Sequence, residues 1–317
     1  MKKILLVKTS SMGDIVHNLP VASDIRASLP DAQIDWVVEE PFAAIPHLHP
    51  AVGQVIPVAI RRWRKALWRR ETRAEIGEFL RRLREHSYDA VIDSQGLLKS
   101  ALLTCAARGR RYGLDWASAR EPLTLFYHRT FSVPWTMHAV ERNRLLAAQA
   151  LGYTLPARVD YGIHATAADF AWLPSARYVV LLHATSAERK LWREPNWIEI
   201  GRHFMKQDIV SVLPWGSAVE RARSDRLAAD IPGAIVSPAL KLDDAAALLA
   251  GARAVIGVDT GFTHLAAALG APTIGVYCAT DPGATGIHAC PRAVNLGGAG
   301  NPPPVGDVIS TLGRLIV

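Results

Sequence analysis

The 317-residue chain has little cysteine, few aromatic residues and no long apolar run. Its three cysteines are scattered without a Cys-x-x-Cys pair, which argues against a disulfide framework and a cysteine zinc site and favours a reducing compartment. Its apolar runs are far shorter than the ~18 residues that a membrane-spanning helix needs. Half of the residues are hydrophobic and 21% are charged, which excludes disorder as the main state.

Several cofactor and catalytic signatures are also missing. No Gly-x-Gly-x-x-Gly follows the first expected strand, so dinucleotide redox chemistry loses its main support. The sequence has no Gly-x-x-x-x-Gly-Lys-Ser/Thr phosphate loop, no His-Glu-x-x-His zinc motif and no Gly-x-Ser-x-Gly nucleophile motif. The chemistry must therefore lie in other motifs.

The net charge of +7 is concentrated in the first half of the chain. Residues 1–160 hold 23 Lys and Arg against 16 Asp and Glu, a balance of +7, whereas residues 161–317 hold 13 of each. Seven bases against Glu71 give +6 within residues 61–73 alone. This run, which also contains Trp63 and Trp68, suits a nucleic acid, a membrane surface or a polyanionic substrate, and a solvated helix face is the plainer alternative.

Short apolar segments alternate with helical ones along the whole chain. This alternation predicts an α/β protein with parallel sheets. The length, and a restart of the pattern after Pro156, predict two doubly wound, Rossmann-like domains, 1–160 and 161–317, with a ligand site in the cleft between them at the carboxyl ends of the strands. Strands are expected over 4–7, 34–38, 90–92, 178–182, 209–213, 234–236, 254–258 and 273–277, and helices over 14–28, 72–86, 138–151, 195–206, 217–229, 243–251, 262–269 and 305–316.

The first chemical motif follows the first strand, where Ser10, Ser11, Gly13 and Asp14 lead into a helix. An Asp at a helix start commonly caps the free backbone N–H groups. A carboxylate at the mouth of an interdomain cleft could instead act as a general base. The two interpretations are compatible, and the sequence leaves both open.

The second motif, Asp259-Thr260-Gly261-Phe262-Thr263-His264, joins a strand to an Ala/Leu-rich helix. Thr260 and Gly261 place a hydroxyl and bare N–H groups at a helix N-terminus, which is a ready anion site. His264, in the first turn, can donate to the same anion, although a lone helix His is more often structural.

Two further loops follow strands of the second half. Thr185, Ser186 and Lys190 offer hydroxyls and a cation that suit a phosphate, with an ordinary solvated loop as the alternative. Glu220 could accept hydrogen bonds from a ribose diol, but a surface Glu is the commoner case.

Together these motifs resemble the GT-B glycosyltransferases and, more narrowly, the ADP-heptose:lipopolysaccharide heptosyltransferases of glycosyltransferase family 9. The similarity runs in order through nearly the whole chain. The segments 10–14 and 61–65 point to the members of the family that transfer the first heptose. Besides the motifs above, the similarity includes residues 55–65, 88–93, 95–100, 115–116, 119–122, 138–142 and 280–283.

This resemblance implies inverting transfer of L-glycero-D-manno-heptose from ADP-heptose to the first Kdo sugar of Kdo2-lipid A, in the lipopolysaccharide inner core of Gram-negative bacteria. Asp14 matches the candidate base. The implied acceptor residues are Ser10, Ser11, Gly13, Arg61, Arg62, Arg64, Lys65 and Arg120. The implied donor residues are Thr185, Ser186, Lys190, Thr260, Gly261 and His264 at the diphosphate, Asp259 at the heptose hydroxyls and Glu220 at the ribose.

The resemblance also implies that ADP-heptose is a substrate and that neither a metal nor a cofactor is needed. Kdo2-lipid A and an anionic membrane surface are the expected partners, at the cytoplasmic face of the inner membrane and without a spanning segment. Three alternatives remain: a sister heptosyltransferase with another core acceptor, a nucleotide-sugar sensor without catalysis, and a nucleic-acid-binding protein using residues 61–73. The last explains none of the motifs after residue 160.

Overall fold

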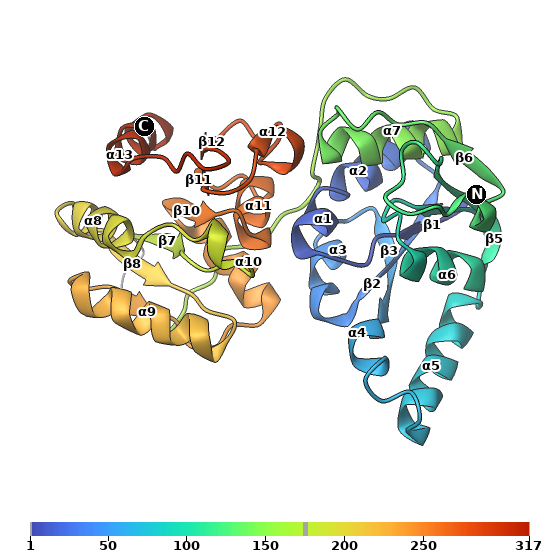
Figure 1. Ribbon diagram of the computed structural model, residues 1–317, viewed down its shortest axis with the longest axis horizontal. Helices are drawn as coiled ribbons and strands as arrows, with labels where there is room; N and C mark the ends of the chain where they lie inside the picture. The colour runs from blue at the N-terminus through green and yellow to red at the C-terminus, as the bar shows by residue number, and fades with distance from the viewer. Residues whose placement is uncertain (1, 174–176, 317) are drawn as a thin grey trace. The chain divides into compact units, whose positions relative to one another are not determined.

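The computed structural model describes residues 2–173 and 177–316. The chain divides into two units, Met1–Ile163 and His164–Val317. Each unit contains one six-stranded sheet whose strands all pair in parallel and whose faces are covered by helices (Figure 1). The prediction of an α/β protein with two doubly wound parallel sheets is confirmed.

The first sheet has the strand order β3-β2-β1-β4-β5-β6, so the direction of winding reverses beside β1. Residues Ile4 to Val7 of β1 are fully buried, as expected for an apolar strand covered on both faces. The carboxyl ends of β1 and β4 meet at this switch point, which is where doubly wound sheets place ligands. The strands are β1 (Lys3–Val7), β2 (Gln33–Glu39), β3 (Val52–Val58), β4 (Ser87–Asp93), β5 (Arg108–Leu114) and β6 (Arg129–Phe131).

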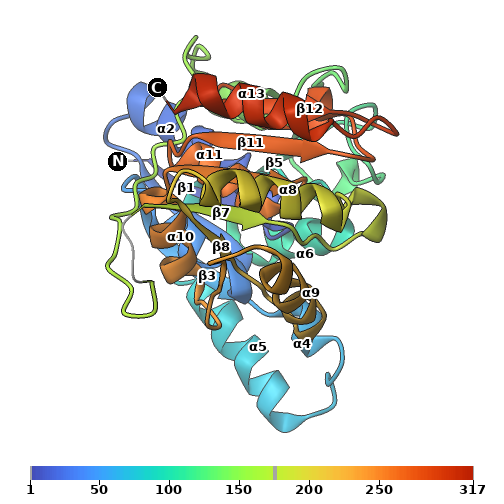
Figure 2. The same ribbon diagram turned by 90° about the vertical axis from the view of Figure 1, so that its left-hand side faces the viewer.

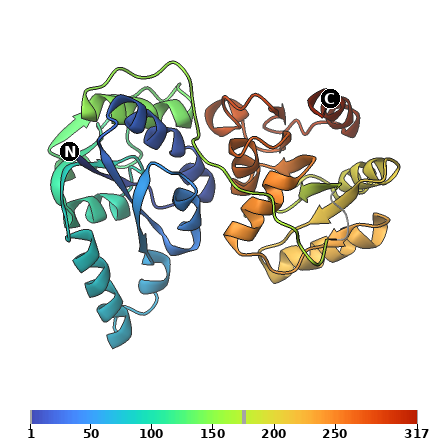
Figure 3. The same cartoon turned by 180° about the vertical axis from the view of Figure 1, so that it is seen from behind.

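Helices cover both faces of the first sheet. α5 and α6 bury Phe79, Leu83 and Leu103 against it, and α5 extends past the sheet in Figure 1. On the opposite face α2 and α7 pack together (Figure 3), and α7 ends at Gly152 in the left-handed conformation, at φ 75°. The helices are α1 (Met12–Val16), α2 (Leu19–Ser28), α3 (Ala44–His47), α4 (Ile60–Trp63), α5 (Arg70–Leu83), α6 (Leu98–Ala106) and α7 (Ala139–Leu151), with 3₁₀ turns η1 (Glu40–Phe42) and η2 (Thr124–Phe126).

The single helix expected over 14–28 is wrong, because the structure has two helices there. α2 starts at Leu19, so Pro20 lies in its first turn, where the missing N–H costs no helical hydrogen bond. The strands β3, β5 and β6 were not expected from the sequence. β5 and β6 carry arginines in place of an apolar run, which hides the strand pattern.

The second sheet has the order β12-β11-β10-β7-β8-β9. Figure 2 shows α8 and α13 in front of its strands. Two other helices of this unit, α10 and α11, pack against each other. The strands are β7 (Tyr178–Leu182), β8 (Val210–Leu213), β9 (Ile235–Val236), β10 (Ala254–Val258), β11 (Thr273–Tyr277) and β12 (Ala293–Gly297). The helices are η3 (Glu188–Lys190), α8 (Glu194–Met205), α9 (Ala218–Asp230), α10 (Leu242–Gly251), α11 (Gly261–Ala268), α12 (Pro282–Thr285) and α13 (Val305–Leu315).

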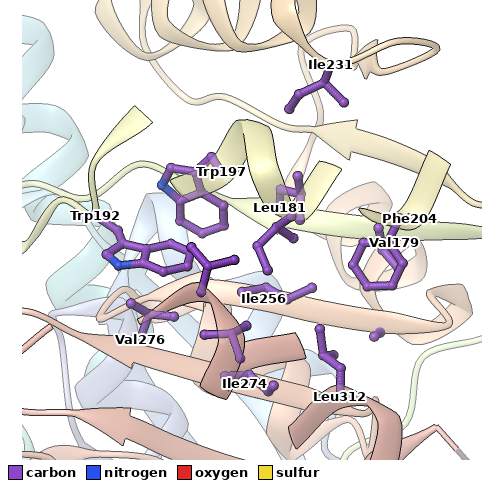
Figure 4. Packing of buried hydrophobic residues seen from close by; sticks show 14 of the residues in the cluster. Val179, Leu181, Trp192, Trp197, Phe204, Ile231, Ile256, Ile274, Val276 and Leu312 are labelled. Carbon is purple, nitrogen blue, oxygen red and sulfur yellow. The ribbon is translucent and has the colours of Figure 1, made fainter. Parts of the chain in front are cut away.

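The core of the second unit is built on two buried tryptophans (Figure 4). The rings of Trp192 and Trp197 meet edge to face, with centroids 5.3 Å apart. They pack with Leu181, Ile256 and Val276 of the central strands, and α13 adds Leu312. This packing fixes the carboxyl ends of β7 and β10, from which the loops of the second unit emerge. No helix within the described ranges is both long and apolar enough to cross a membrane.

Candidate functional site

In the first unit, the loop after β1 is held by side chains from the loop after β4. The Gln95 Oε1 atom accepts from the backbone N–H groups of Thr9 and Ser10, at 3.0 and 3.1 Å. The Lys99 ammonium, from the first turn of α6, donates to Ser10 Oγ over 2.7 Å. Hydrogen bonds therefore join the two loops at the switch point of the sheet. This places Ser10, Ser11 and Gly13 beside the start of α6.

Asp14 occupies the first turn of α1, and its carboxylate reaches back to the residue that caps the helix. Its Oδ2 atom accepts from the Ser11 backbone N–H at 2.8 Å and from the Ser11 hydroxyl at 3.0 Å. In the part of the chain that the structure describes, no hydrogen bond reaches the other oxygen, Oδ1. Ser11, not Asp14, is therefore the N-cap of α1, and Asp14 satisfies the Ser11 backbone N–H as the third helical residue of a capping box. One carboxylate oxygen stays available for a proton.

Two buried titratable side chains, Lys8 and Asp93, lie where these loops leave β1 and β4. The Lys8 ammonium donates to the Ser94 carbonyl at 2.7 Å, and Asp93 accepts from the Tyr127 hydroxyl at 2.8 Å. Burial lowers the pKa of Lys8, while Asp14 and Asp93 oppose that shift; burial also raises the pKa of Asp93. These two side chains thus anchor the ends of β1 and β4 from which the two loops start.

Lys99 lies at the centre of the charges around this loop. Burial lowers its pKa, Arg61 and Arg64 lower it further, and Glu39 and Asp14 raise it. Glu39 ends β2, is almost fully buried, and has a pKa raised by burial and lowered by the backbone and charge of Arg61. The sequence interpretation assigned no role to Lys99 or Glu39. Glu39 directly follows the expected strand 34–38, which is the signal that could have singled it out; Lys99 lies on α6 and has no such signal.

The cationic side chains of residues 61–73, here called the basic segment, differ in whether a carboxylate already binds them. Arg62 binds two carboxylates, with Nε 3.1 Å from Glu40 and Nη1 2.7 Å from Glu75. Arg61, Arg64 and Lys65 are exposed on the same short helix or just after it. The structure thus brings Arg61 and Arg64 toward Lys99, but it engages Arg62 internally. Arg120, after β5, is exposed and acts electrostatically on Lys8.

The two tryptophans of the basic segment have different environments. Trp63 is buried, stacks edge to face on Phe79 and donates to Glu75 over 2.8 Å, so it belongs to the core. Trp68 is 89% exposed, and the Arg73 guanidinium lies over its ring at 5.9 Å. Only Trp68 of this pair can meet a ligand or a lipid surface.

In the second unit, Asp259 gathers cationic and hydroxyl groups at the end of β10. Its Oδ2 atom accepts from Lys190 Nζ and from the Thr280 hydroxyl, each at 2.7 Å, and its Oδ1 atom lies 3.5 Å from His264 Nε2. Burial raises the pKa of Asp259, but the hydrogen bonds from His264, Lys190 and Thr280 outweigh it and hold the pKa well below its usual range. Asp259 is therefore an ionised carboxylate throughout the neutral range.

The same turn starts α11, whose first residues leave backbone N–H groups unpaired within the helix. Thr260 is the capping residue and its side chain makes no capping hydrogen bond, and Gly261 is the first helical residue. Thr185 Oγ1 donates to the Asp259 carbonyl at 3.1 Å, which brings the loop after β7 to this helix start. Lys190, Thr185, Thr260, Gly261 and His264 thus lie around one helix N-terminus that suits an anionic group.

Ser186 and Glu220 complete the predicted set in the second unit. Ser186 is exposed next to Thr185. Glu220 lies in the first turn of α9, where its carboxylate accepts from the Gly216 N–H at 2.7 Å and its own N–H donates to Ser217 Oγ at 3.3 Å. These contacts of Glu220 are those of a helix start. Thr280, which sequence reasoning passed over, follows β11 and is a direct partner of Asp259.

Each unit, taken by itself, carries groups that suit one part of a group transfer from an anionic leaving group to a hydroxyl. One unit has a carboxylate with an available oxygen beside cations, and the other has a cation and a helix N-terminus beside an ionised acid. Across residues 2–173 and 177–316, no three His, Cys, Asp or Glu side chains are grouped to hold a metal ion.

Comparison with known proteins identifies the class. The family model for glycosyltransferase family 9 (heptosyltransferase) matches residues 76–303, so the chain belongs to this family, whose GT-B fold it shares. A lipopolysaccharide heptosyltransferase 1 from Pseudomonas aeruginosa is 51% identical over 289 residues, covering 90% of this chain and 81% of that protein. The corresponding protein from Escherichia coli K12 is 47% identical over 287 residues, covering 90% of each chain.

The solved structures agree. The E. coli heptosyltransferase WaaC with ADP superposes with a TM-score of 0.90 at 42% identity and covers 99% of both chains. The same enzyme with ADP-2-deoxy-2-fluoro heptose gives a TM-score of 0.85, covering 98% of this chain and 99% of that one. The chain is therefore a glycosyltransferase of the heptosyltransferase type.

Proposed function

We propose that the chain transfers heptose from ADP-heptose to the first Kdo sugar of Kdo2-lipid A, in synthesis of the lipopolysaccharide inner core. The observation that carries the proposal is the ionised Asp259 held by Lys190, Thr280 and His264 at the start of α11. Family membership supports it, because relatives about half identical over 90% of this chain carry the name lipopolysaccharide heptosyltransferase 1.

The donor would bind to the second unit, His164–Val317. The diphosphate would accept hydrogen bonds from the N-terminal amides of α11, the hydroxyls of Thr185 and Ser186, and the cation of Lys190. His264 would donate to the same phosphates, Asp259 would accept from the heptose hydroxyls, and Glu220 would accept from the ribose. These groups also stabilise the negative charge that the departing ADP acquires, and that is their catalytic effect.

The acceptor would bind to the first unit, Met1–Ile163, with its hydroxyl at Asp14. Asp14 Oδ1 takes the proton of the acceptor hydroxyl as its oxygen bonds to the anomeric carbon of the heptose. The bond from that carbon to the phosphate oxygen of ADP breaks on the opposite face, so the configuration inverts. Ser10, Ser11 and Gly13 line that position. Arg61, Arg64, Lys65 and Arg120 would bind the carboxylates and phosphates of Kdo2-lipid A, and Arg62 would mainly hold α4 in place through Glu40 and Glu75.

The expected location of the enzyme is the cytoplasmic face of the inner membrane, where it would bind as a peripheral protein. The supporting observation is the charge distribution, because all of the excess positive charge lies in the unit assigned to the anionic lipid acceptor. The second unit needs no net charge, because its anion contacts are local.

One incubation tests the proposal directly. Purified protein is mixed with ADP-heptose and Kdo2-lipid A, and the lipid is analysed by mass spectrometry for the addition of one heptose. A second reaction uses an acceptor that already carries the first heptose. We expect product only in the first reaction and none with Asp14→Asn. Product only in the second reaction would instead identify a sister enzyme, and no product in either would contradict the proposal.

A further inference from the structure

The first unit exposes three leucines on neighbouring elements, here called the α6 apolar surface: Leu98, Leu102 and Leu125. Their exposed fractions are 49%, 55% and 96%. Leu98 and Leu102 are four residues apart on α6 and therefore lie on one face of that helix. A single exposed leucine is ordinary, but adjacent ones indicate an interaction surface.

The contacts of η2 place Leu125 beside that face. Leu123, Phe126 and Tyr127, which flank Leu125, pack on Ala101 of α6. The thiol of Cys105, one turn after Leu102, lies 3.6 Å from the Phe126 carbonyl. The Leu98 backbone N–H donates to Glu121 over 2.6 Å, so the segment that leads into η2 is held to the start of the helix. The three leucines thus project from two elements that pack against each other.

Cations border this surface on the side of the loop that carries Asp14. Lys99, between Leu98 and Leu102 in sequence, donates to Ser10 and interacts electrostatically with Arg61 and Arg64. Trp116, 76% exposed, and Arg120 lie on the segment that joins β5 to η2. An apolar face with cations beside it is the composition that binds the interface of an anionic bilayer.

We infer that the α6 apolar surface docks the first unit on a bilayer with anionic headgroups, with Leu98, Leu102 and Leu125 entering the boundary between headgroups and acyl chains. The inference rests on the proposed function for its lipid partner. It assigns the apolar part of membrane binding to α6 and η2, separate from the basic residues 61–73. Because α6 starts next to Ser10, docking there brings a lipid-linked sugar to the loop of Asp14 without extracting the lipid.

Vesicle binding tests the inference. The triple variant Leu98→Ser, Leu102→Ser, Leu125→Ser removes apolar area without changing charge, and Met205→Ser is the control, since Met205 is 43% exposed in the second unit. Co-sedimentation uses vesicles of phosphatidylcholine with one quarter phosphatidylglycerol. We expect roughly a tenfold lower partition coefficient for the triple variant and no change for the control. At 0.5 M NaCl, where headgroup attraction is screened, binding that remains in the native protein should vanish in the triple variant.

The single variant Leu125→Ser tests whether a loss of binding could come from misfolding. It should fold normally, because a side chain 96% exposed contributes little to the core. It should lower the partition coefficient about threefold with unchanged thermal unfolding. Equal binding by native protein and triple variant would overturn the inference. So would a native dimer in sedimentation analysis that becomes a monomer in the triple variant, because the surface would then bind a second copy.

An activity assay separates this inference from the proposed function. On acceptor embedded in vesicles, the triple variant should lose about tenfold in kcat/KM, whereas on a water-soluble, deacylated acceptor it should match the native protein. Equal losses on both acceptors would contradict a docking role. If the native protein transfers heptose to neither acceptor, the proposed function fails, while the vesicle partition still decides the inference.

Discussion

Lys190 Nζ and Asp259 Oδ2 lie 2.7 Å apart, on two loops that follow neighbouring strands of the second sheet. The lysine is one of the groups that hold the pKa of Asp259 well below its ordinary value. The pair thus combines two functions that the sequence suggested separately, a cation for phosphate and an acid for sugar hydroxyls. Each residue orients the other before any substrate arrives.

Replacing either Lys190 or Asp259 should therefore lower kcat/KM by more than the loss of that residue's own contact with the substrate. Lys190→Met and Asp259→Asn are each expected to lower kcat/KM for ADP-heptose roughly 100-fold, because each leaves the partner misplaced. The double variant should lose much less than the product of the single losses, since the pair is already broken. The matched controls are Lys241→Met and Asp243→Asn, both exposed in the same unit. Strictly multiplicative losses would show that the two residues act independently.

Asp14 should be required for transfer but not for donor binding. Asp14→Asn retains an oxygen that can accept from Ser11, so α1 should keep its start, while the proton acceptor is lost. We expect kcat to fall at least roughly 1,000-fold with ADP affinity unchanged by calorimetry. Asp31→Asn, an exposed acid of the same unit, is the control. Near-native turnover by Asp14→Asn would remove the residue from the base role.

The arginines of the basic segment should separate by function. Arg61→Gln with Arg64→Gln is expected to raise KM for the lipid acceptor about tenfold and leave KM for ADP-heptose unchanged. Arg62→Gln should affect acceptor KM less, because the Arg62 guanidinium is bound by Glu40 and Glu75. Steady-state assays with each substrate varied in turn measure this. Arg253→Gln, exposed in the second unit, is the control, and an Arg62 effect as large as that of Arg61 with Arg64 would contradict the division.

These contrasts show which parts of the site a sequence can reveal. Local chemistry is readable, since the Asp259–His264 turn and the Ser10–Asp14 loop each lie within a few residues. Pairing across the fold is not: Lys99 contacts Ser10 from 89 residues away, and Thr280 reaches Asp259 from the next strand along the sheet. The same limit applies to charge, because only the tertiary fold shows that Glu40 and Glu75 engage Arg62 and not its neighbours.

Strand prediction failed at β5 and β6, where arginines replace apolar residues, and also at β3 and β12. β5 reads Arg-Gly-Arg-Arg-Tyr-Gly-Leu, and its place in the sheet follows from pairing with β4 and β6. The central strands β1, β7, β10 and β11 were predicted because burial on both faces requires continuous apolar runs. Strands with continuous apolar runs are therefore predictable from the sequence, whereas β5, which lacks such a run, takes its place from its neighbours.

The buried His183 makes stability depend on pH in a predictable direction. It follows β7, its Nε2 atom lies 2.8 Å from Ser224 Oγ, and its ring meets Trp197 edge to face at 6.5 Å. Burial, with Arg223 adding to it, lowers the pKa of His183 to about 4. Because the unfolded chain binds the proton more readily, the folded state is fully favoured above about pH 6.5 and loses stability as pH falls from there toward 4.

A substitution isolates this contribution from the other titrating groups. The second unit should lose roughly 3 kcal/mol between pH 7.5 and 4 through His183 alone. His183→Asn keeps a polar group near Ser224 but cannot titrate, so it should be less stable than the native protein at pH 7.5 and show a correspondingly smaller loss at low pH. Urea unfolding followed by tryptophan fluorescence measures both, since Trp192 and Trp197 lie in the same core. His203→Asn, on the surface of α8, serves as the control, and an identical pH dependence in native protein and His183→Asn would show that His183 does not carry the effect.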